Sequence, residues 1–453
     1  MTTLVTTFRS TDTGAPTLSG TAGDLINVLS HCLVIGKVFS TTNDIAFTDN
    51  TTEARTNISG QTPFTLFPTP ATADRTYFGH SSKFTSLTFG LAVNGSAATY
   101  VWEYWNGTTW STLTVTDGTT GFTTSGTVTW TSPIDWATTA VNAVTEYWVR
   151  VRFTGTAPTT NPTVNYITYL GWLEVQTGTN QRDYKQGPGS NGYIMSINDN
   201  GPGVGTGQEA RIKGFEVSTS LGVGTNQFPT VAQAANGQFI RKSNALSAAT
   251  RGWVVIADTR TVYIFLATTD VATTYSAMAF GDIYSLSTLP NDPGRCILIA
   301  RNNENVATIG ATSEYMGAMV QLGSITPGHY LNRDYQGTAS AVQCSKTGAL
   351  EYSSGYAGLL GGYTAMIGSI AFKNPADNQV YVSPMWVHTI AGGNYFRGRL
   401  RGFYMFCHSA ASATDGDTFT GSGDLAGKTF MIVKLISDAS LAAIETSDTW
   451  ESN

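Results

Sequence analysis

The sequence is short of charge. Only 12% of its 453 residues are Asp, Glu, Lys or Arg, against roughly a quarter in ordinary soluble domains. The formal net charge of -6 is modest, so the composition gives no electrostatic reason to expect binding to DNA or to an anionic membrane surface. We therefore expect neither a nucleic-acid nor a membrane partner.

Cysteine is also scarce, and no two cysteines form a Cys-x-x-Cys pair. The four are Cys32, Cys296, Cys344 and Cys407. Each has apolar or small neighbours, so we expect four buried thiols rather than disulfides or metal ligands. Such thiols suit assembly in a reducing cytoplasm.

Long apolar runs are missing. No window approaches the roughly 20 apolar residues of a membrane span. The N-terminus, Met-Thr-Thr-Leu-Val-Thr-Thr-Phe-Arg-Ser, lacks the basic region and apolar run of a signal peptide.

Motifs for catalysis or cofactor binding are missing too. The histidines have no His-Glu-x-x-His spacing, and no Gly-x-Ser-x-Gly elbow occurs. The glycine-rich stretch 201–207 lacks the Lys-Ser/Thr of a phosphate-binding loop. Paired carboxylates for glycoside hydrolysis remain open, but acidic residues are few. We expect no enzyme activity and no cofactor.

Three aspartates near the C-terminus form a candidate calcium site. Asp415, Asp417 and Asp424 alternate with glycines and could gather oxygen ligands for Ca²⁺. An EF-hand loop that begins at Asp415 needs Glu at position 426, where the sequence has Ala426. The favoured interpretation is a structural turn without metal.

Glycine, threonine and aromatic residues are abundant. The chain has 48 glycines, 11% aromatic residues and 41% hydrophobic residues, which is enough for a core. This composition predicts a mainly β protein with short strands and tight turns. The length favours two or three domains.

Aromatic residues concentrate between Tyr100 and Phe153. Six of the ten tryptophans lie there: Trp102, Trp105, Trp110, Trp130, Trp136 and Trp148. Asn106-Gly107 between aromatic runs predicts a β-hairpin with a type I′ turn. We expect a small antiparallel β-sandwich whose tryptophans fill its core or a protein interface; a sugar-stacking platform is the alternative.

The strand 147–153 alternates two kinds of side chain. Tyr147, Val149, Val151 and Phe153 should face the core, while the other face carries aromatic and cationic groups. On that second face, the interface candidates are Trp148, Arg150 and Arg152.

This region resembles a module of tailed-bacteriophage tail and baseplate proteins. The motifs that carry the resemblance are W-N-G-x-x-W at 105–110, P-x-D-W at 133–136 and Y-W-V-R-V-R at 147–152. The module spans about 38–170.

The flanking sequence begins with a helix signal. Leu25, Leu29 and Leu33 recur every four residues, Ser19 and Thr21 offer N-caps, and Gly36 follows. Beyond the module, the stretches 253–257 and 262–267 predict a hairpin at the centre of a sheet covered on both faces. Further strands are expected at 295–300, 380–382 and 429–436, and a loop at 355–368.

These flanks resemble a second family, phage virion proteins known as uncharacterised structural proteins. The matching residues are 8–16, 18–20, the helix through 33–36, 171–172, 193–194, 210–211, 214–216, 228–230, 241–243, 251–253, 280–282, 397–400 and 416–421. The match stops near residue 37 and resumes near 171. We expect a discontinuous outer β-rich domain, 1–37 and 171–453, with one N-terminal helix, interrupted by an inserted β-sandwich, 38–170.

Three arginines alternate in the outer domain. Arg397, Arg399 and Arg401 would project from one strand face, and arginine is enriched at protein interfaces. We interpret them as a row of salt bridges between subunits; carbohydrate or nucleic-acid contact is the alternative.

The two resemblances imply a structural component of a tailed-phage virion, in the tail, baseplate or collar. It would be assembled in the host cytoplasm and act as a homo-oligomer with other virion proteins. Low surface charge agrees with permanent contacts. The alternatives are a fibre or spike domain that binds a host-surface polysaccharide, a capsid-surface decoration protein and, more remotely, a cell-wall or capsule hydrolase.

Overall fold

A computed structural model describes the chain in segments. They are residues 5–12, 14–35, 44–49, 55–57, 63–67, 74–80, 83–155, 157–168, 171–187, 189–199, 209–243, 248–268, 275–286, 295–300, 329–334, 337–338, 342–347, 381–389, 396–407, 414–434, 441–447 and 449–451. The stretches 201–207 and 355–368, expected as a turn and a loop, lie outside the described residues.

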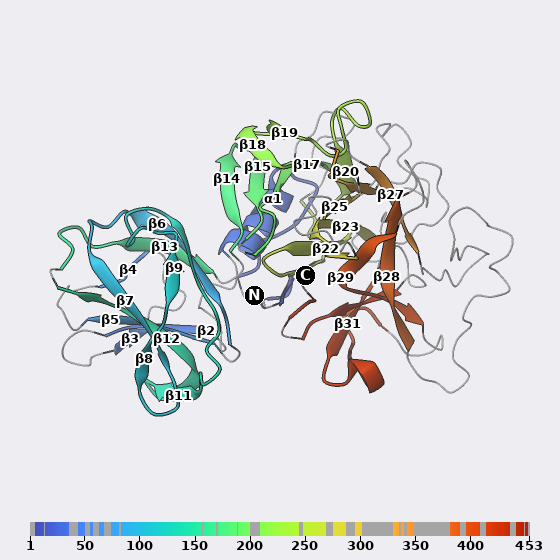
Figure 1. The fold of residues 1–453 in the computed structure, drawn as a ribbon. Coiled ribbons are helices and arrows are strands. Elements are labelled where there is room, and N and C mark those ends of the chain that lie inside the picture. Colours follow the sequence, from blue (N-terminus) through green and yellow to red (C-terminus); the bar gives the residue numbers. More distant parts are fainter. Residues whose placement is uncertain are drawn as a thin grey trace, which may run out of the picture. The chain divides into compact units, whose positions relative to one another are not determined.

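The chain is mainly β, as expected, and divides into two compact units (Figure 1). The first unit comprises Ser30–Trp172. The second comprises Val5–Leu29 and Leu173–Asn453, so it is discontinuous in sequence. The first unit starts before residue 38 because the helical turn Ser30–Ile35 contacts one of its strands, β13.

The first unit is an antiparallel β-sandwich. One sheet has the order β4 (Phe64–Thr65), β13 (Thr163–Thr168), β6 (Ser86–Val93), β10 (Gly126–Trp130) and β9 (Val115–Asp117). The other has the order β3 (Arg55–Asn57), β2 (Asp44–Asp49), β5 (Arg75–His80), β12 (Val144–Thr154), β7 (Thr99–Trp105) and β8 (Trp110–Thr112), with β11 (Thr138–Val141) paired to β12.

Alternation along the strands builds the sandwich core. Phe89 and Val164 of the first sheet pack in one cluster with Phe78, Trp102 and Val151 of the second. Because successive side chains of a strand point to opposite faces, three of the four residues predicted to face inward on β12, Val149, Val151 and Phe153, are each 0% exposed. The fourth, Tyr147, is partly buried and packs against the same core.

The hairpin at Asn106-Gly107 exists, but its turn is not type I′. Gly107 has φ 98°, whereas Asn106 lies outside the left-handed region. Instead, Asn106 Oδ1 accepts hydrogen bonds from the N–H groups of Thr108 (3.0 Å) and Thr109 (2.8 Å), which widens the loop to four residues. Positive φ at both central residues, the type I′ requirement, occurs between β11 and β12, at Asn142 (50°) and Ala143 (66°).

The second unit contains one small sheet, one large sheet and a hairpin. The small sheet has the order β14 (Leu173–Thr177), β15 (Gln181–Lys185), β16 (Ile194–Asn198), β17 (Glu209–Phe215) and β20 (Gln238–Arg241). The hairpin is β18 (Val217–Ser220) and β19 (Val223–Thr225).

The large sheet has thirteen strands. Their order is β1 (Thr6–Arg9), β21 (Trp253–Ala257), β22 (Thr261–Ala267), β23 (Tyr275–Asp282), β25 (Cys296–Ile299), β26 (His329–Leu331), β27 (Val342–Thr347), β28 (Tyr381–Thr389), β29 (Phe396–Cys407), β32 (Leu441–Glu445), β31 (Thr429–Lys434) and β30 (Thr418–Thr420), with β24 (Tyr284–Ser285) paired to β29.

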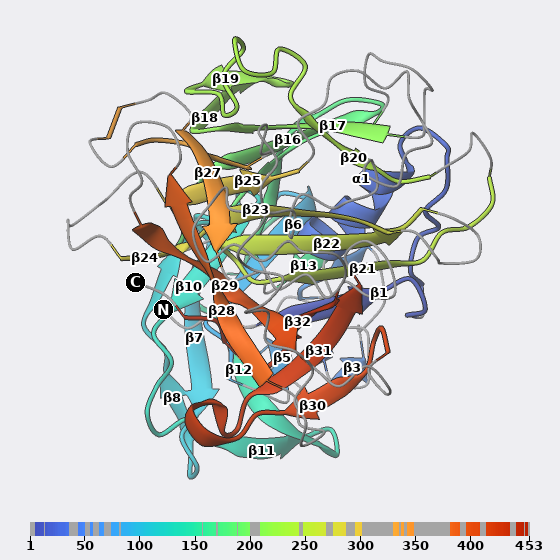
Figure 2. The same ribbon diagram turned by 90° about the vertical axis from the view of Figure 1, so that its right-hand side faces the viewer.

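The large sheet turns back on itself. Figure 2 shows β28 and β29 crossing in front of β22. Tyr263 of β22 donates its hydroxyl hydrogen to the carbonyl of Arg401 in β29, at 2.7 Å, and packs with Phe403 and Trp450 in the main core. A short strand, β24, follows β23 in the chain and pairs with β29. It therefore connects the β21–β23 part of the sheet to the β28–β29 part.

The predicted hairpin in the large sheet is confirmed. All seven residues of β22 are buried, as expected for a strand covered on both faces. Its place differs from the prediction, because only β1 lies outside β21 in the sheet order. The strands expected at 295–300, 380–382 and 429–436 correspond to β25, the start of β28 and β31.

The predicted helix is present over its whole leucine stripe, but only its first half is α-helical. It begins as an α-helix, α1 (Asp24–Leu29), and continues as a π-helix, η1 (Ser30–Ile35). Ser19 and Thr21 lie before its start, and Ser19 Oγ donates to Asp24 Oδ2 at 2.5 Å. The described residues also include a 3-10 turn, η3 (Gly423–Leu425).

Burial agrees with the expectation for three cysteines. Cys32, Cys296 and Cys344 carry buried thiols, while the side chain of Cys407 lies outside the described part. Within the described segments, no helix combines the length and apolar character needed to span a bilayer.

We predict that the inserted region folds by itself. Replacing residues 38–170 by a short Gly/Ser linker should leave a soluble protein that unfolds cooperatively, because the cost of closing a loop grows only slowly with its length. Circular dichroism during urea denaturation measures this, with the isolated 38–170 piece as the companion sample. A molten remainder together with an unfolded piece would contradict the nested arrangement.

Candidate interface surfaces

The three arginines predicted to form a row at the surface, Arg397, Arg399 and Arg401, are not all exposed. Arg401 is 1% exposed, and its guanidinium binds both carboxylate oxygens of Asp258, at 3.0 and 2.6 Å. It also donates to Thr261 Oγ1 at 3.0 Å and to the carbonyl of Glu451 at 2.7 Å. The expectation that Arg401 is a surface anchor is wrong, because the folded-over sheet places Asp258 opposite this face of β29.

The other two arginines differ in exposure. Arg397 is 4% exposed, so it does not present a free guanidinium at the surface either. Arg399 keeps 23% of its side chain exposed and pairs with the carboxylate of Glu451. Its Cζ lies 4.8 Å from the ring centre of Tyr284 and 5.9 Å from that of Trp386.

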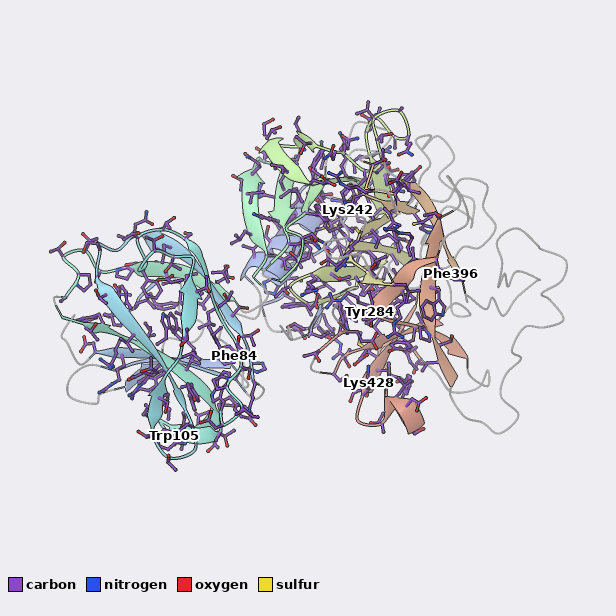
Figure 3. The ribbon with its side chains drawn as sticks, viewed as in Figure 1. Phe84, Trp105, Lys242, Tyr284, Phe396 and Lys428 are labelled. Atoms are coloured by element: carbon purple, nitrogen blue, oxygen red, sulfur yellow. The ribbon has the colours of Figure 1, made fainter. Side chains whose placement is uncertain are left out.

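Exposed apolar side chains lie on or directly after the two strands, β24 and β29, that carry Tyr284 and Arg399. Phe396 is 58% exposed and meets Trp386 edge to face at 6.5 Å between ring centres. Leu286 is 47% exposed and follows β24, where its N–H donates to the carbonyl of Arg397. We call Tyr284, Leu286, Trp386, Phe396 and Arg399 the Arg399 surface (Figure 3 labels Tyr284 and Phe396).

In the first unit, the two candidate arginines, Arg150 and Arg152, form ion pairs with the same glutamate. Glu103 of β7 accepts from Arg150 Nε at 2.7 Å and from Arg152 Nη2 at 3.1 Å. Burial would raise the pKa of Glu103, but hydrogen bonds and charge from Arg152 and Arg150 outweigh it, so the pKa is lowered. Arg150 also stacks on Trp110, with its Cζ 4.2 Å from the ring centre.

Trp148 lies on the sheet face that points away from the sandwich core, and it is buried there in a separate small cluster. It is 0% exposed, packs with Tyr77 and Val141, and donates from Nε1 to the carbonyl of Thr139 at 2.9 Å. Its ring lies directly over Gly79, where a Cβ would come within 2.5 Å of the ring. The prediction of Trp148 as an interface residue is therefore wrong, because its ring packs over Gly79, its partner on β5, and against Tyr77 and Val141 on this face of the sheet.

The tryptophans divide between the core and one partly exposed edge. Trp102, Trp130 and Trp136 belong to the sandwich core. Trp105 and Trp110 are only partly buried and meet edge to face at 5.7 Å.

The loop at residues 133–137 lies beside the end of β7. Ile134 is 99% exposed. Its neighbours bind the end of β7: Asp135 Oδ1 accepts from the hydroxyl of Tyr104 at 2.9 Å, and the N–H of Ala137 donates to the carbonyl of Trp105 at 3.0 Å. We call Trp105, Trp110 and Ile134 the Trp105 surface (Figure 3 labels Trp105).

Sequence reasoning missed Phe396, Leu286 and Ile134. Only Ile134 carries a signal, since an aliphatic residue between Pro133 and Asp135 in a corner has no strand face to fill. For Phe396 and Leu286, the pairing of β24 with β29 decides their exposure, and the sequence gives no sign of that pairing.

The C-terminal aspartates lie in a turn. Asp417 Oδ2 accepts from the N–H and the hydroxyl of Thr414, at 2.9 and 2.5 Å, and Asp415 and Asp424 are exposed. In the part of the chain that the structure describes, no group of three His, Cys, Asp or Glu side chains could hold a metal ion.

Asp282 gives the second unit a pH dependence. Burial raises its pKa to about 6, although the hydrogen bond from Gln186 and the charges of Arg401 and Arg260 oppose the shift. The folded chain therefore takes up this proton at a higher pH than the unfolded chain, whose carboxyl has the ordinary value of 3.8. Stability from this group must rise as the pH falls through about 6 and be lowest above it.

We predict that Asp282→Asn removes this dependence. The amide oxygen can still accept from Gln186 Nε2, which lies 3.0 Å from Oδ1. The free energy of unfolding of the wild type minus that of the variant should rise by up to about 3 kcal/mol between pH 8 and pH 4. Urea denaturation across this range measures it; a difference that is constant with pH would contradict the assignment.

No family model matches the chain, and no curated protein matches it either.

Proposed function

We propose that this protein is a structural component of a tailed-phage virion, in the tail, baseplate or collar, and that it acts through oligomeric assembly rather than catalysis. The proposal starts from the resemblance of the sequence to phage tail modules and virion proteins. The observation that carries it further is the Arg399 surface. There the exposed side chains of Phe396 and Leu286 come from, or directly follow, the same strand pair as Arg399, whose guanidinium lies near the rings of Tyr284 and Trp386.

The composition of the Arg399 surface fits a permanent protein contact. Interfaces draw most of their binding energy from aromatic and arginine anchors surrounded by groups that exclude water. Phe396 and Leu286 supply apolar area. Arg399 is held in place by Tyr284 and Glu451, so little side-chain entropy remains to be lost on binding.

The test introduces charge at this surface. Phe396→Asp combined with Leu286→Asp should shift the purified protein from an oligomer to a monomer in light scattering and prevent its incorporation into particles. Val231→Asp is the matched control, because Val231 is 64% exposed outside this surface. If the doubly substituted protein assembles like the wild type, the Arg399 surface does not form the contact. If the wild type is absent from particles, the proposal is wrong.

Antibody-gold labelling of intact particles addresses the position on the virion. Label on the tail or baseplate supports the proposal as stated. Label on the head favours a capsid-surface decoration protein.

A second candidate function is binding of a host-surface polysaccharide through the Trp105 surface. The observation that favours it is the partial exposure of Trp105 beside the fully exposed Ile134, because an aromatic ring with one wet side can stack on a sugar ring. Loss of host-cell binding by Trp105→Ala, with unchanged assembly, would favour this function over the first.

A further inference from the structure

A lysine and an aspartate of the second unit meet in complete burial. Lys242 Nζ lies 2.5 Å from Asp199 Oδ1, and both side chains are 0% exposed. Asp199 follows β16 and Lys242 follows β20, with β17 between these strands in the sheet. Apart from this contact with Lys242, Asp199 Oδ1 has no hydrogen-bond partner.

The surrounding backbone fixes both groups. Asp199 Oδ2 accepts from the N–H of Leu25 at 2.9 Å, and the N–H of Ile26 also reaches the carboxylate. On the other side, Lys242 Nζ donates to the carbonyl of Thr21. Oδ2 thus accepts from the N–H of Leu25, while the nitrogen lies against Oδ1.

We propose that Lys242 and Asp199 are joined by an intramolecular isopeptide bond, formed by loss of water after the chain has folded. This inference does not depend on the proposed function. It assigns a covalent modification to a pair that would otherwise be a buried ion pair, an arrangement whose desolvation cost is high.

The first step is proton transfer within the pair. The ammonium gives a proton to Oδ1, which leaves a neutral amine and a neutral carboxylic acid. Burial favours these neutral forms over two charges. Burial shifts Asp199 in this direction: it raises the pKa of the carboxyl to about 6, in spite of the opposing charge and hydrogen bond of Lys242 and the backbone hydrogen bonds.

The second step forms the amide. The Nζ lone pair attacks Cγ of Asp199, and negative charge develops on Oδ2, where the N–H group of Leu25 stabilises it. The Cγ–Oδ1 bond then breaks, and Oδ1 leaves as water with its own proton and one from Nζ. One N–C bond replaces one C–O bond with no oxidant or reductant, and fixed proximity replaces a bimolecular encounter.

The bond would staple three strands of the small sheet together. It closes a loop from Asp199 to Lys242 that contains β17 and β20, and such a closure restricts the unfolded chain as a disulfide does. Unlike a disulfide, an amide forms and persists in a reducing compartment.

Intact-mass spectrometry of the denatured, full-length protein tests the proposal. The wild type should be lighter than its sequence by one water molecule, and Lys242→Arg should have its full sequence mass. Trypsin should yield peptide 242–251 joined to peptide 186–211, because an acylated Lys242 is not cleaved.

Lys428 is the matched control in the same chain. Its Nζ lies 2.9 Å from Glu445 Oε2, but its side chain is 28% exposed, so an ordinary ion pair and normal cleavage are expected there (Figure 3 labels Lys242 and Lys428). Full sequence mass for the wild type, with cleavage after Lys242, would overturn the proposal and leave an ion pair. The wild-type mass decides the question even if Lys242→Arg does not fold.

Discussion

Replacing Arg401 by alanine is expected to lower the unfolding free energy of the second unit by about 3–5 kcal/mol. The pair with Asp258 is almost fully enclosed, with side-chain exposures of 1% and 0%. Removing the guanidinium leaves a buried carboxylate without its counter-ion, and it also removes the hydrogen bonds to Thr261 and Glu451. The penalty therefore exceeds the value of one surface ion pair by several-fold.

Hydrogen exchange followed by mass spectrometry measures this change unit by unit. The amides of β22 should exchange faster in Arg401→Ala, while those of β12 in the first unit should not change. Arg399→Ala is the control: its ion pair with Glu451 is partly exposed, so it should cost less than about 1 kcal/mol. Equal effects of the two substitutions would show that burial of the Asp258 pair does not govern stability.

Trp148→Ala is expected to destabilise the first unit by about 3–5 kcal/mol, the usual cost of truncating a large buried aromatic side chain. The ring is fully buried against Tyr77 and Val141, and its loss also leaves the carbonyl of Thr139 without the indole donor. Trp105→Ala is the matched control, because Trp105 is only partly buried, and it should cost clearly less.

Gly79→Ala tests the same packing from the other side. The added methyl group would come within 2.5 Å of the Trp148 ring, so overpacking should cost about 1–3 kcal/mol. Thermal unfolding of the first unit followed by tryptophan fluorescence measures all three variants. If Trp148→Ala lowers the unfolding temperature no more than Trp105→Ala does, the cluster of Tyr77, Val141 and Trp148 is not a second core of this unit.

Local pattern was enough to predict much of the fold. Strict alternation identified the buried face of β12, and two apolar runs around Asp258 identified the hairpin β21–β22, because a strand's side-chain period follows from its own geometry. The turn at Asn106 was less predictable. An Asn side chain can accept hydrogen bonds from the following backbone amides, and this local bonding competes with the type I′ turn.

The candidate contacts were least predictable, because alternation says which residues share a face and not what covers that face. Trp148 and Arg401 occupy the outward positions of their strands, yet both are buried, since Tyr77 and Val141 pack against one and Asp258 of the returning sheet binds the other. The sequence by itself determined the β class, the tryptophan-rich sandwich and its inward side chains, all of which depend on short-range periodicity. Only the tertiary structure decided that Phe396 and Leu286 stay exposed and that Lys242 meets Asp199. Each of these depends on pairing between segments far apart in the chain, which local side-chain patterns do not encode.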